Sequence, residues 1–230
     1  MKSNTKPSKK SSAVALLAVV ACMAAASASG ADMKVAGKIA PPTCDVKVHG
    51  EDGGSEINFD VNFDALDPNA STAVPSKLMM FEVDCGARRT AIAIRAVDNN
   101  ADGKPTDARS FHFSDNIITT GIPSNRYFGL GLAASGKPVG AYAVRIKRVQ
   151  VDSNNFNTLV TSSDGINWSA PATAAYFSTD QPYITAGSLG AAGSFFRIPL
   201  DIGANISRTS DFPPGNVALA GSATIEVLYF

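Results

Sequence analysis

ATIEVLYF, at positions 223–230, alternates strictly between two faces. One face carries Ala223, Ile225, Val227 and Tyr229, and the other carries Thr224, Glu226, Leu228 and Phe230. This period of two predicts a β-strand with an apolar face. A strand this apolar needs a cover, because an open one is an aggregation site. The stretch therefore predicts either a central strand of a closed β-sandwich or a strand that a partner covers.

The rest of the chain repeats this pattern in short runs separated by clusters of Gly, Pro, Asn, Asp and Ser, which favour turns. Further strands are expected at 56–63, 77–85, 90–97, 126–133, 140–151 and 195–202. Asp164-Gly165, between two short runs, predicts a hairpin. No window after residue 30 combines a helical apolar stripe with caps. Many short strands at this spacing predict an all-β fold, an antiparallel sandwich.

The N-terminus has the three-part pattern of a secretory signal. Lysines between positions 2 and 10 form a basic region, residues 13–26 are apolar, and small residues follow. Residues 1–30 are therefore expected to be a signal peptide. An alternative is lipidation of Cys22, although the apolar run continues past this cysteine. No other stretch predicts a transmembrane segment.

Charge and cysteine content constrain the partners and the compartment. The full chain carries 20 Lys+Arg and 20 Asp+Glu. The signal contains four lysines and no acid, so the remainder has 16 basic and 20 acidic residues and a net charge near −4. A nucleic-acid partner would need a basic patch, so none is expected. Cys44 and Cys85 remain after the signal, and an oxidising compartment predicts a disulfide between them. Two free buried thiols are the alternative.

The expected mature N-terminus, residues 31–42, contains another short amphipathic strand. Along it, Met33, Val35, Gly37 and Ile39 alternate with Lys34, Ala36 and Lys38. Pro41-Pro42 ends the run, since proline cannot donate to a β-ladder. The simplest interpretation is a first strand that pairs within its own domain.

In this order, the features resemble a pilin of the chaperone–usher class. They are most similar to a family of unknown function described as probable major subunits of beta-fimbriae. The resemblance rests on Gly37 ahead of Cys44, on MFEVDC ending at Cys85, and on the penultimate aromatic Tyr229. It also rests on YFGLGL, GKPVGAYAV and SDGINW in the middle of the chain. No single feature is specific, but together they cover most of residues 31–230.

The resemblance implies an incomplete immunoglobulin-like sandwich, residues 43–230, that lacks its last strand and is completed by a donor strand. A periplasmic chaperone would fill the resulting groove first. At an outer-membrane usher, the N-terminal strand of another copy or a related pilin would replace it, as in other β-strand additions. The donor residues would be Met33, Val35, Gly37 and Ile39. The pairing strand would contain Ile225, Val227 and Tyr229.

Repetition of this contact implies a fibre, because a head-to-tail interface does not close on itself. The resemblance therefore implies export through the periplasm to a fimbria on the cell surface. The same N-terminal strand could instead fold back and complete its own domain.

Patterns typical of catalysis are weak. The histidines are His49 and His112, and His112 alternates with Phe111 and Phe113, which predicts a solvent-facing side chain. No GxSxG motif is present, and a His/Cys metal site lacks ligands. We therefore expect a protein that is not an enzyme and that carries no cofactor.

One polar loop partly matches a calcium-binding pattern. Asp98, Asn100 and Asp102 fit the first half of an EF-hand loop. The position of the closing acidic ligand holds Arg109, although Asp107 is nearby. Because Asp, Asn and Gly also favour turns, a turn between strands is the preferred interpretation.

An alternative function is a monomeric exported sandwich that binds a ligand such as a carbohydrate, with Trp168, Tyr176 and Tyr183 as a platform. A tip adhesin would carry a receptor domain in place of the donor strand. The sequence has the strand and no spare domain, which favours a shaft or adaptor subunit. The two classes differ on one point: a pilin needs its N-terminal strand in trans, whereas a monomeric binder does not.

Overall fold

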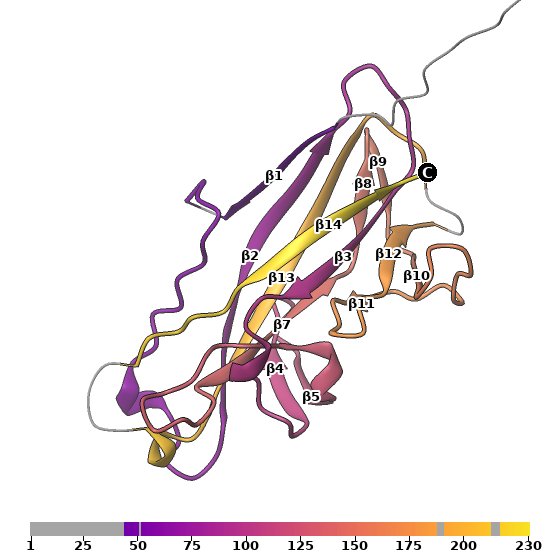
Figure 1. Ribbon diagram of the computed structural model, residues 1–230. Helices are drawn as coiled ribbons and strands as arrows, with labels where there is room; N and C mark the ends of the chain where they lie inside the picture. Colours follow the sequence, from indigo (N-terminus) through magenta and orange to yellow (C-terminus); the bar gives the residue numbers. More distant parts are fainter. Residues whose placement is uncertain (1–43, 51, 188–190, 213–216) are drawn as a thin grey trace, which may run out of the picture. The chain divides into compact units, whose positions relative to one another are not determined.

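Figure 1 shows the fold, from a computed structural model that describes residues 44–50, 52–187, 191–212 and 217–230. Every pairing between the described strands is antiparallel. The prediction of an antiparallel all-β fold is therefore confirmed. None of the described helices is long and apolar enough to cross a membrane. The expected signal peptide and the N-terminal strand lie outside the described residues.

The larger sheet curls into a half-barrel. Its strands lie in the order β1-β2-β13-β7-β11, with β6 on β7, β8 on β13 and β9 on β8. Their bounds are β1 Asp45–Gly50, β2 Thr72–Asp84, β6 Phe128–Gly129, β7 Gly140–Ile146, β8 Val149–Val151, β9 Asn154–Phe156, β11 Ala175–Tyr176 and β13 Phe195–Ile206. The register of β13 on β2 shifts near Gly203, where a Cβ would lie 2.7 Å from the carbonyl oxygen of His112. Only glycine allows β4 to approach this closely.

The smaller sheet has the order β10-β12-β3-β14, and β4 and β5 form a separate hairpin. The bounds are β3 Ile92–Asp98, β10 Leu159–Ser162, β12 Tyr183–Ala186, β14 Ala223–Tyr229, β4 Arg109–His112 and β5 Ile118–Ile122. Short 3₁₀ turns occupy Phe63–Ala65 (η1), Ala101–Gly103 (η2), Ser124–Arg126 (η3) and Thr209–Asp211 (η4). The main core cluster contains buried residues of both sheets, such as Ile94 of β3 with Phe81 of β2 and Phe196 of β13.

A buried ion network fastens the β4–β5 hairpin to the larger sheet. Arg145 on β7 lies 2.8 Å from Asp201 on β13 and 3.0 Å from Asp115 in the hairpin turn. Ser114 donates its backbone N–H and its hydroxyl to Asp201. The guanidinium of Arg145 also lies 4.1 Å from the centroid of the Phe113 ring. Because the side chains of Arg145 and Asp201 are 6% and 7% exposed, this network belongs to the protein interior.

Several strand predictions are confirmed and others need correction. The runs at 77–85, 90–97, 195–202 and 223–230 correspond to β2, β3, β13 and β14. The run 140–151 is two strands, β7 and β8, interrupted at Lys147 and Arg148. The prediction for 126–133 holds only at β6, since η3 precedes it and Gly131 has a positive φ of 91°.

The strand predicted at 56–63 is wrong as a paired strand. The described residues 56–62 belong to no ladder, and the chain then turns into η1. The turn is stabilised by the side chain of Asn62, which accepts a hydrogen bond from the backbone N–H of Asp64 at 3.0 Å. Phe63 is consequently 47% exposed and does not share the inward face predicted for it. Local turn chemistry ended the strand pattern before its last apolar residue.

The predicted disulfide between Cys44 and Cys85 is present, with an S–S distance of 2.10 Å. It joins the residue before β1 to the residue after β2. The predicted reversal at Asp164-Gly165 is also present, with Gly165 at a φ of 73°. It is wider than a two-residue hairpin, because the backbone N–H of Ser169 returns to the carbonyl of Thr161.

Candidate functional site: a groove between two open strand edges

Two strands on the same side of the fold each have one open edge. Among the described strands, β1 pairs only with β2, and β14 pairs only with β3. Val46 and Val48 of β1 and Ala223 and Ile225 of β14 line one common groove. The backbone N–H and C=O groups on both open edges are therefore available to another strand.

The groove has a volume of about 830 Å³. One wall is formed by Val46 and Val48 of β1 and by residues 55–59, and the other by residues between Val217 and Ile225. Side chains from the centre of the larger sheet form its floor, namely Met79, Phe81, Tyr142, Val144, Leu200 and Ile202. A long groove with an apolar floor and unpaired backbone on its walls has the shape and chemistry to accept an extended chain.

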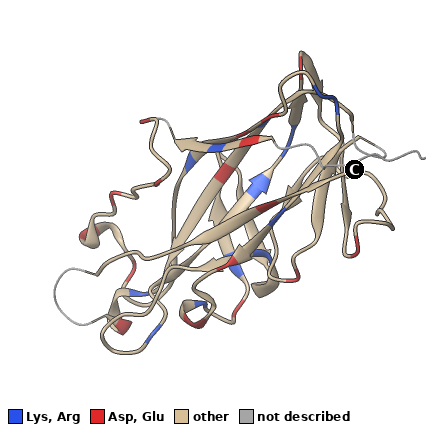
Figure 2. Ribbon diagram, turned by 45° about the horizontal axis from the view of Figure 1, so that its top comes forward, with Lys and Arg blue, Asp and Glu red and all other residues tan. Residues whose placement is uncertain are grey.

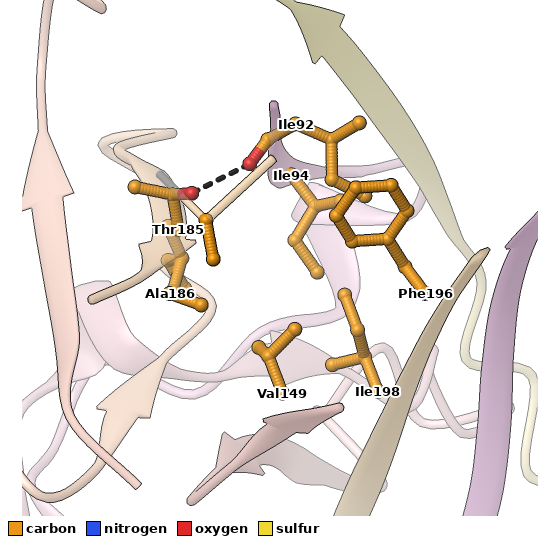
Figure 3. A pocket seen from close by; sticks show the side chains of 9 residues that line it. Ile92, Ile94, Val149, Thr185, Ala186, Phe196 and Ile198 are labelled. Atoms are coloured by element: carbon orange, nitrogen blue, oxygen red, sulfur yellow. Dashed lines mark hydrogen bonds between the residues drawn. The ribbon is translucent and has the colours of Figure 1, made fainter. Parts of the chain in front are cut away.

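The core is closed on the side that β12 covers. Here β3 and β12 face β8 and β13 around a cavity of only about 10 Å³ (Figure 3). Ile94, Phe196 and Ile198 point into this space, and Thr185 donates its hydroxyl to the carbonyl of Ile92 at 2.6 Å. A space of this size holds about one water molecule. The core is therefore packed where β12 covers it and open where β14 faces β1.

The segment 56–61 extends the β1 wall without forming a strand. Ile57, Phe59 and Val61 are half-buried against the core, and the residues between them are exposed. Within the described chain, no backbone group of residues 56–61 bonds to another backbone group. The alternation that predicted a strand is thus present, but the pairing partner that a strand requires is not among the described residues.

Tyr142 on the groove floor and Tyr229 on β14 are uncharged at neutral pH. Burial raises the pKa of Tyr142, which lines the floor, and the negative charge of Asp98 raises it further. Burial likewise raises the pKa of Tyr229 on β14. The hydroxyl of a neutral tyrosine can still donate a hydrogen bond. The floor that an incoming chain meets therefore gains no charge from the phenol of Tyr142.

The residues predicted for the pairing strand occupy one face of β14. Ile225, Val227 and Tyr229 pack on the core while remaining half-buried. The predicted donor residues Met33, Val35, Gly37 and Ile39 lie outside the described residues. The sequence does not reveal the floor residues. Apolar positions alternate along β2 and β13 in the same way whether or not another strand of the same chain covers them.

The other sequence candidates do not converge on a site. Asp98 accepts a hydrogen bond from the backbone N–H of Asn100, whose side chain donates to the carbonyl of Ala220. Asp102 is exposed in η2, so this segment has the contacts of a turn. No three His, Cys, Asp or Glu side chains of the described chain cluster as metal ligands.

The aromatic residues of the alternative platform are divided between the two sheets. Tyr176 lies in β11 of the larger sheet and packs on Phe113, with ring centroids 5.9 Å apart. Tyr183 lies in β12 of the smaller sheet, beneath Arg95. His49 and His112 are also separate, since His49 lies on β1 and His112 on β4. The three aromatic residues therefore do not form one continuous surface.

The loop 163–168 folds over the outward face of β14. Trp168 packs on Phe230 with ring centroids 5.9 Å apart, and a Cβ on Gly165 would lie 3.1 Å from Leu228. Asp164 holds the loop by accepting hydrogen bonds from the backbone N–H groups of Ile166 and Asn167. These bonds keep the pKa of the Asp164 carboxyl well below its usual range. Because Trp168 is the one tryptophan of the chain, its fluorescence reports on the end of β14.

Replacing Asp164 with alanine is expected to move the fluorescence of Trp168 to longer wavelength, because the released loop exposes the indole. In the unchanged protein, the lowered pKa means that the carboxylate persists as the pH falls through about 4, the usual aspartate value. The loop should therefore open only at lower pH. Emission spectra recorded against pH test both points, with Asp180→Ala as an exposed acidic control. An unchanged spectrum for Asp164→Ala would contradict the role of this carboxylate.

Comparison with protein-family models and with curated proteins found no match to this chain.

Proposed function

We propose that this chain is a structural subunit of a bacterial surface fimbria, assembled by donor-strand exchange through the chaperone–usher route. The observation that carries the proposal is the groove between the open edges of β1 and β14, with core side chains on its floor. In this proposal the domain is an immunoglobulin-like sandwich without its last strand. The role is structural rather than catalytic, and no cofactor or nucleic acid takes part.

The groove supports strand addition because it offers the two kinds of contact that hold an added strand, backbone hydrogen bonds and apolar side-chain packing. Unpaired backbone groups on the walls can bond to an added strand, and the apolar floor can accept every second side chain. Residues 31–42 of another copy have the required alternation, with Met33, Val35 and Ile39 facing inward. A periplasmic chaperone and an outer-membrane usher are the proposed partners before assembly, and the fibre surface is the proposed destination.

The directions of the two walls determine how an added strand can pair. β1 begins beside the disulfide at Cys85, and β14 ends nearby, where Phe230 and Ala91 exchange backbone hydrogen bonds. The two walls therefore run in opposite directions (Figure 1). A strand folding back from Cys44 would lie antiparallel to β1 and hence parallel to β14. A strand from another copy can take the reverse direction, in which it lies antiparallel to β14 and parallel to β1. Either donor therefore makes one antiparallel and one parallel pairing, and the peptide experiment below distinguishes a groove that needs a donor from one that is already complete.

The test uses a chain that begins at Pro42 and a synthetic peptide of residues 31–42. We expect the peptide to raise the thermal unfolding midpoint of the shortened chain, because a ligand that binds only the folded state stabilises it by mass action. It should also change the fluorescence of Trp168, which contacts the end of β14.

The matched control is a peptide in which Met33, Val35 and Ile39 are replaced by serine, and it should have no effect. A shortened chain that is fully stable and ignores the unmodified peptide would show that the sandwich is already complete. The fimbrial proposal would then fail, and a monomeric exported binding domain would become the better interpretation.

A further inference from the structure

The wall formed by residues 56–61 carries a regular pattern of charge. Glu56, Asn58 and Asp60 are exposed and alternate with the side chains that face the core. In an extended chain, Glu56 and Asp60 are about 13 Å apart and point to the same side. Figure 2 shows acidic residues along the segment that descends from β1. Neither Glu56 nor Asp60 forms an ion pair within the described residues.

Charges on the opposite wall are already balanced. Glu226, on the outward face of β14, lies 2.6 Å from Arg95 of β3. On the other wall, Lys47 of β1 lies in register with Glu82 of β2, which forms its ion pairs with His49 and Arg197. Among the described residues that line the groove, Glu56 alone is charged, and Asp60 follows it on the same exposed face of a segment with unpaired backbone groups.

The proposed donor has the complementary pattern. Lys34 and Lys38 alternate with the apolar residues of the segment 31–42 and have the same spacing as Glu56 and Asp60. When Met33, Val35 and Ile39 face the floor, both lysines face outward. Outward side chains on adjacent strands have Cβ atoms about 5 Å apart, within reach of an ion pair.

We propose that Glu56 and Asp60 select the incoming strand and set its register by pairing with Lys34 and Lys38 of a second copy. This inference rests on the proposed function, since it names a recognition feature of the same groove. It is independent of strand direction, because reversing the strand still places two lysines opposite two acids.

The charge pattern distinguishes registers of the donor strand that the apolar floor does not distinguish. A slip of one residue would point both lysine side chains toward the floor, and the apolar floor disfavours this register. A slip of two residues keeps every apolar residue inward, so the floor discriminates against it only weakly. That slip places a lysine opposite Asn58 and leaves both acids without a lysine partner. The two acids therefore distinguish registers that the apolar contacts treat as similar, and they reject donors with acids at these positions.

The experiment uses the full mature chain, which contains both the donor and the acceptor. Assembly of purified chains into fibres is followed by light scattering and electron microscopy at low salt. Glu56→Lys/Asp60→Lys and Lys34→Glu/Lys38→Glu should each slow assembly by roughly threefold to tenfold, the effect of two exposed ion pairs and weaker steering. The chain with all four substitutions should assemble at close to the original rate. The differences should shrink at 0.5 M salt, which screens exposed charges.

The control is Asp102→Lys/Asp180→Lys, which changes net charge equally at exposed acids outside the groove lining. It should not slow assembly. If the unchanged chain assembles and the swapped variants match its rate, the inference is overturned and the proposed function stands. The inference is also overturned if the chain with all four substitutions assembles slowly although its unfolding midpoint is unchanged. If the unchanged chain neither assembles nor responds to the peptide of residues 31–42, the proposed function itself fails.

Discussion

Replacing Cys44 and Cys85 with alanine should lower the free energy of unfolding by about 4 kcal/mol, the value that chain entropy assigns to a loop of this length. The two cysteines are 41 residues apart and join β1 to β2. Their bond restricts the unfolded chain and holds the β1 wall, whose only strand partner among the described residues is β2. Denaturant unfolding of the oxidised protein and the double variant measures the difference.

Reduction of the unchanged protein provides the control, because it breaks the same bond without altering the side chains. The reduced protein and the double variant should have similar midpoints. The strand peptide should also bind the variant more weakly, since an unfastened β1 is a less ordered wall. A loss below 1 kcal/mol would contradict the expectation and would mean that β1 is held by its ladder with β2 alone.

Arg145→Ala should lower the free energy of unfolding by about 3–5 kcal/mol, the usual cost of breaking a buried ion pair from one side. The substitution leaves Asp201, with a side chain 7% exposed, as a buried charge without its cation. It also removes the contact from Asp115, which fastens the β4–β5 hairpin. Denaturant unfolding measures the loss, and hydrogen exchange should show the hairpin opening first.

Lys147→Ala is the matched control, because Lys147 also contacts Asp115, at 3.1 Å, but is half exposed. It should cost less than about 1 kcal/mol, as exposed pairs do. The bond from Arg145 is the main cause that holds the pKa of the Asp115 carboxyl below its usual range. A lowered folded-state pKa adds stability above about pH 4 that is lost as the pH falls. Arg145→Ala should therefore reduce this acid dependence, whereas equal costs for the two variants would refute the assignment.

The all-β class, the disulfide and the two faces of the C-terminal strand are predictable from the sequence. Each of these depends on local information. The alternation in residues 223–230 sets which side chains of β14 face the core, because successive side chains on a strand point to opposite sides. The pairing of Cys44 with Cys85 is predictable because they are the two cysteines that remain after the expected signal.

Which strands lack a neighbour becomes visible only when the sheets are packed together. Residues 56–61 alternate as cleanly as β14, yet they pair with no described strand. Likewise, Phe81 and Leu200 have the periodicity of ordinary core residues and nevertheless form the floor of a groove. Periodicity records which side of a strand is apolar, but it does not record what lies beside the strand. That depends on contacts between residues far apart in the sequence, which form only when the sheets pack.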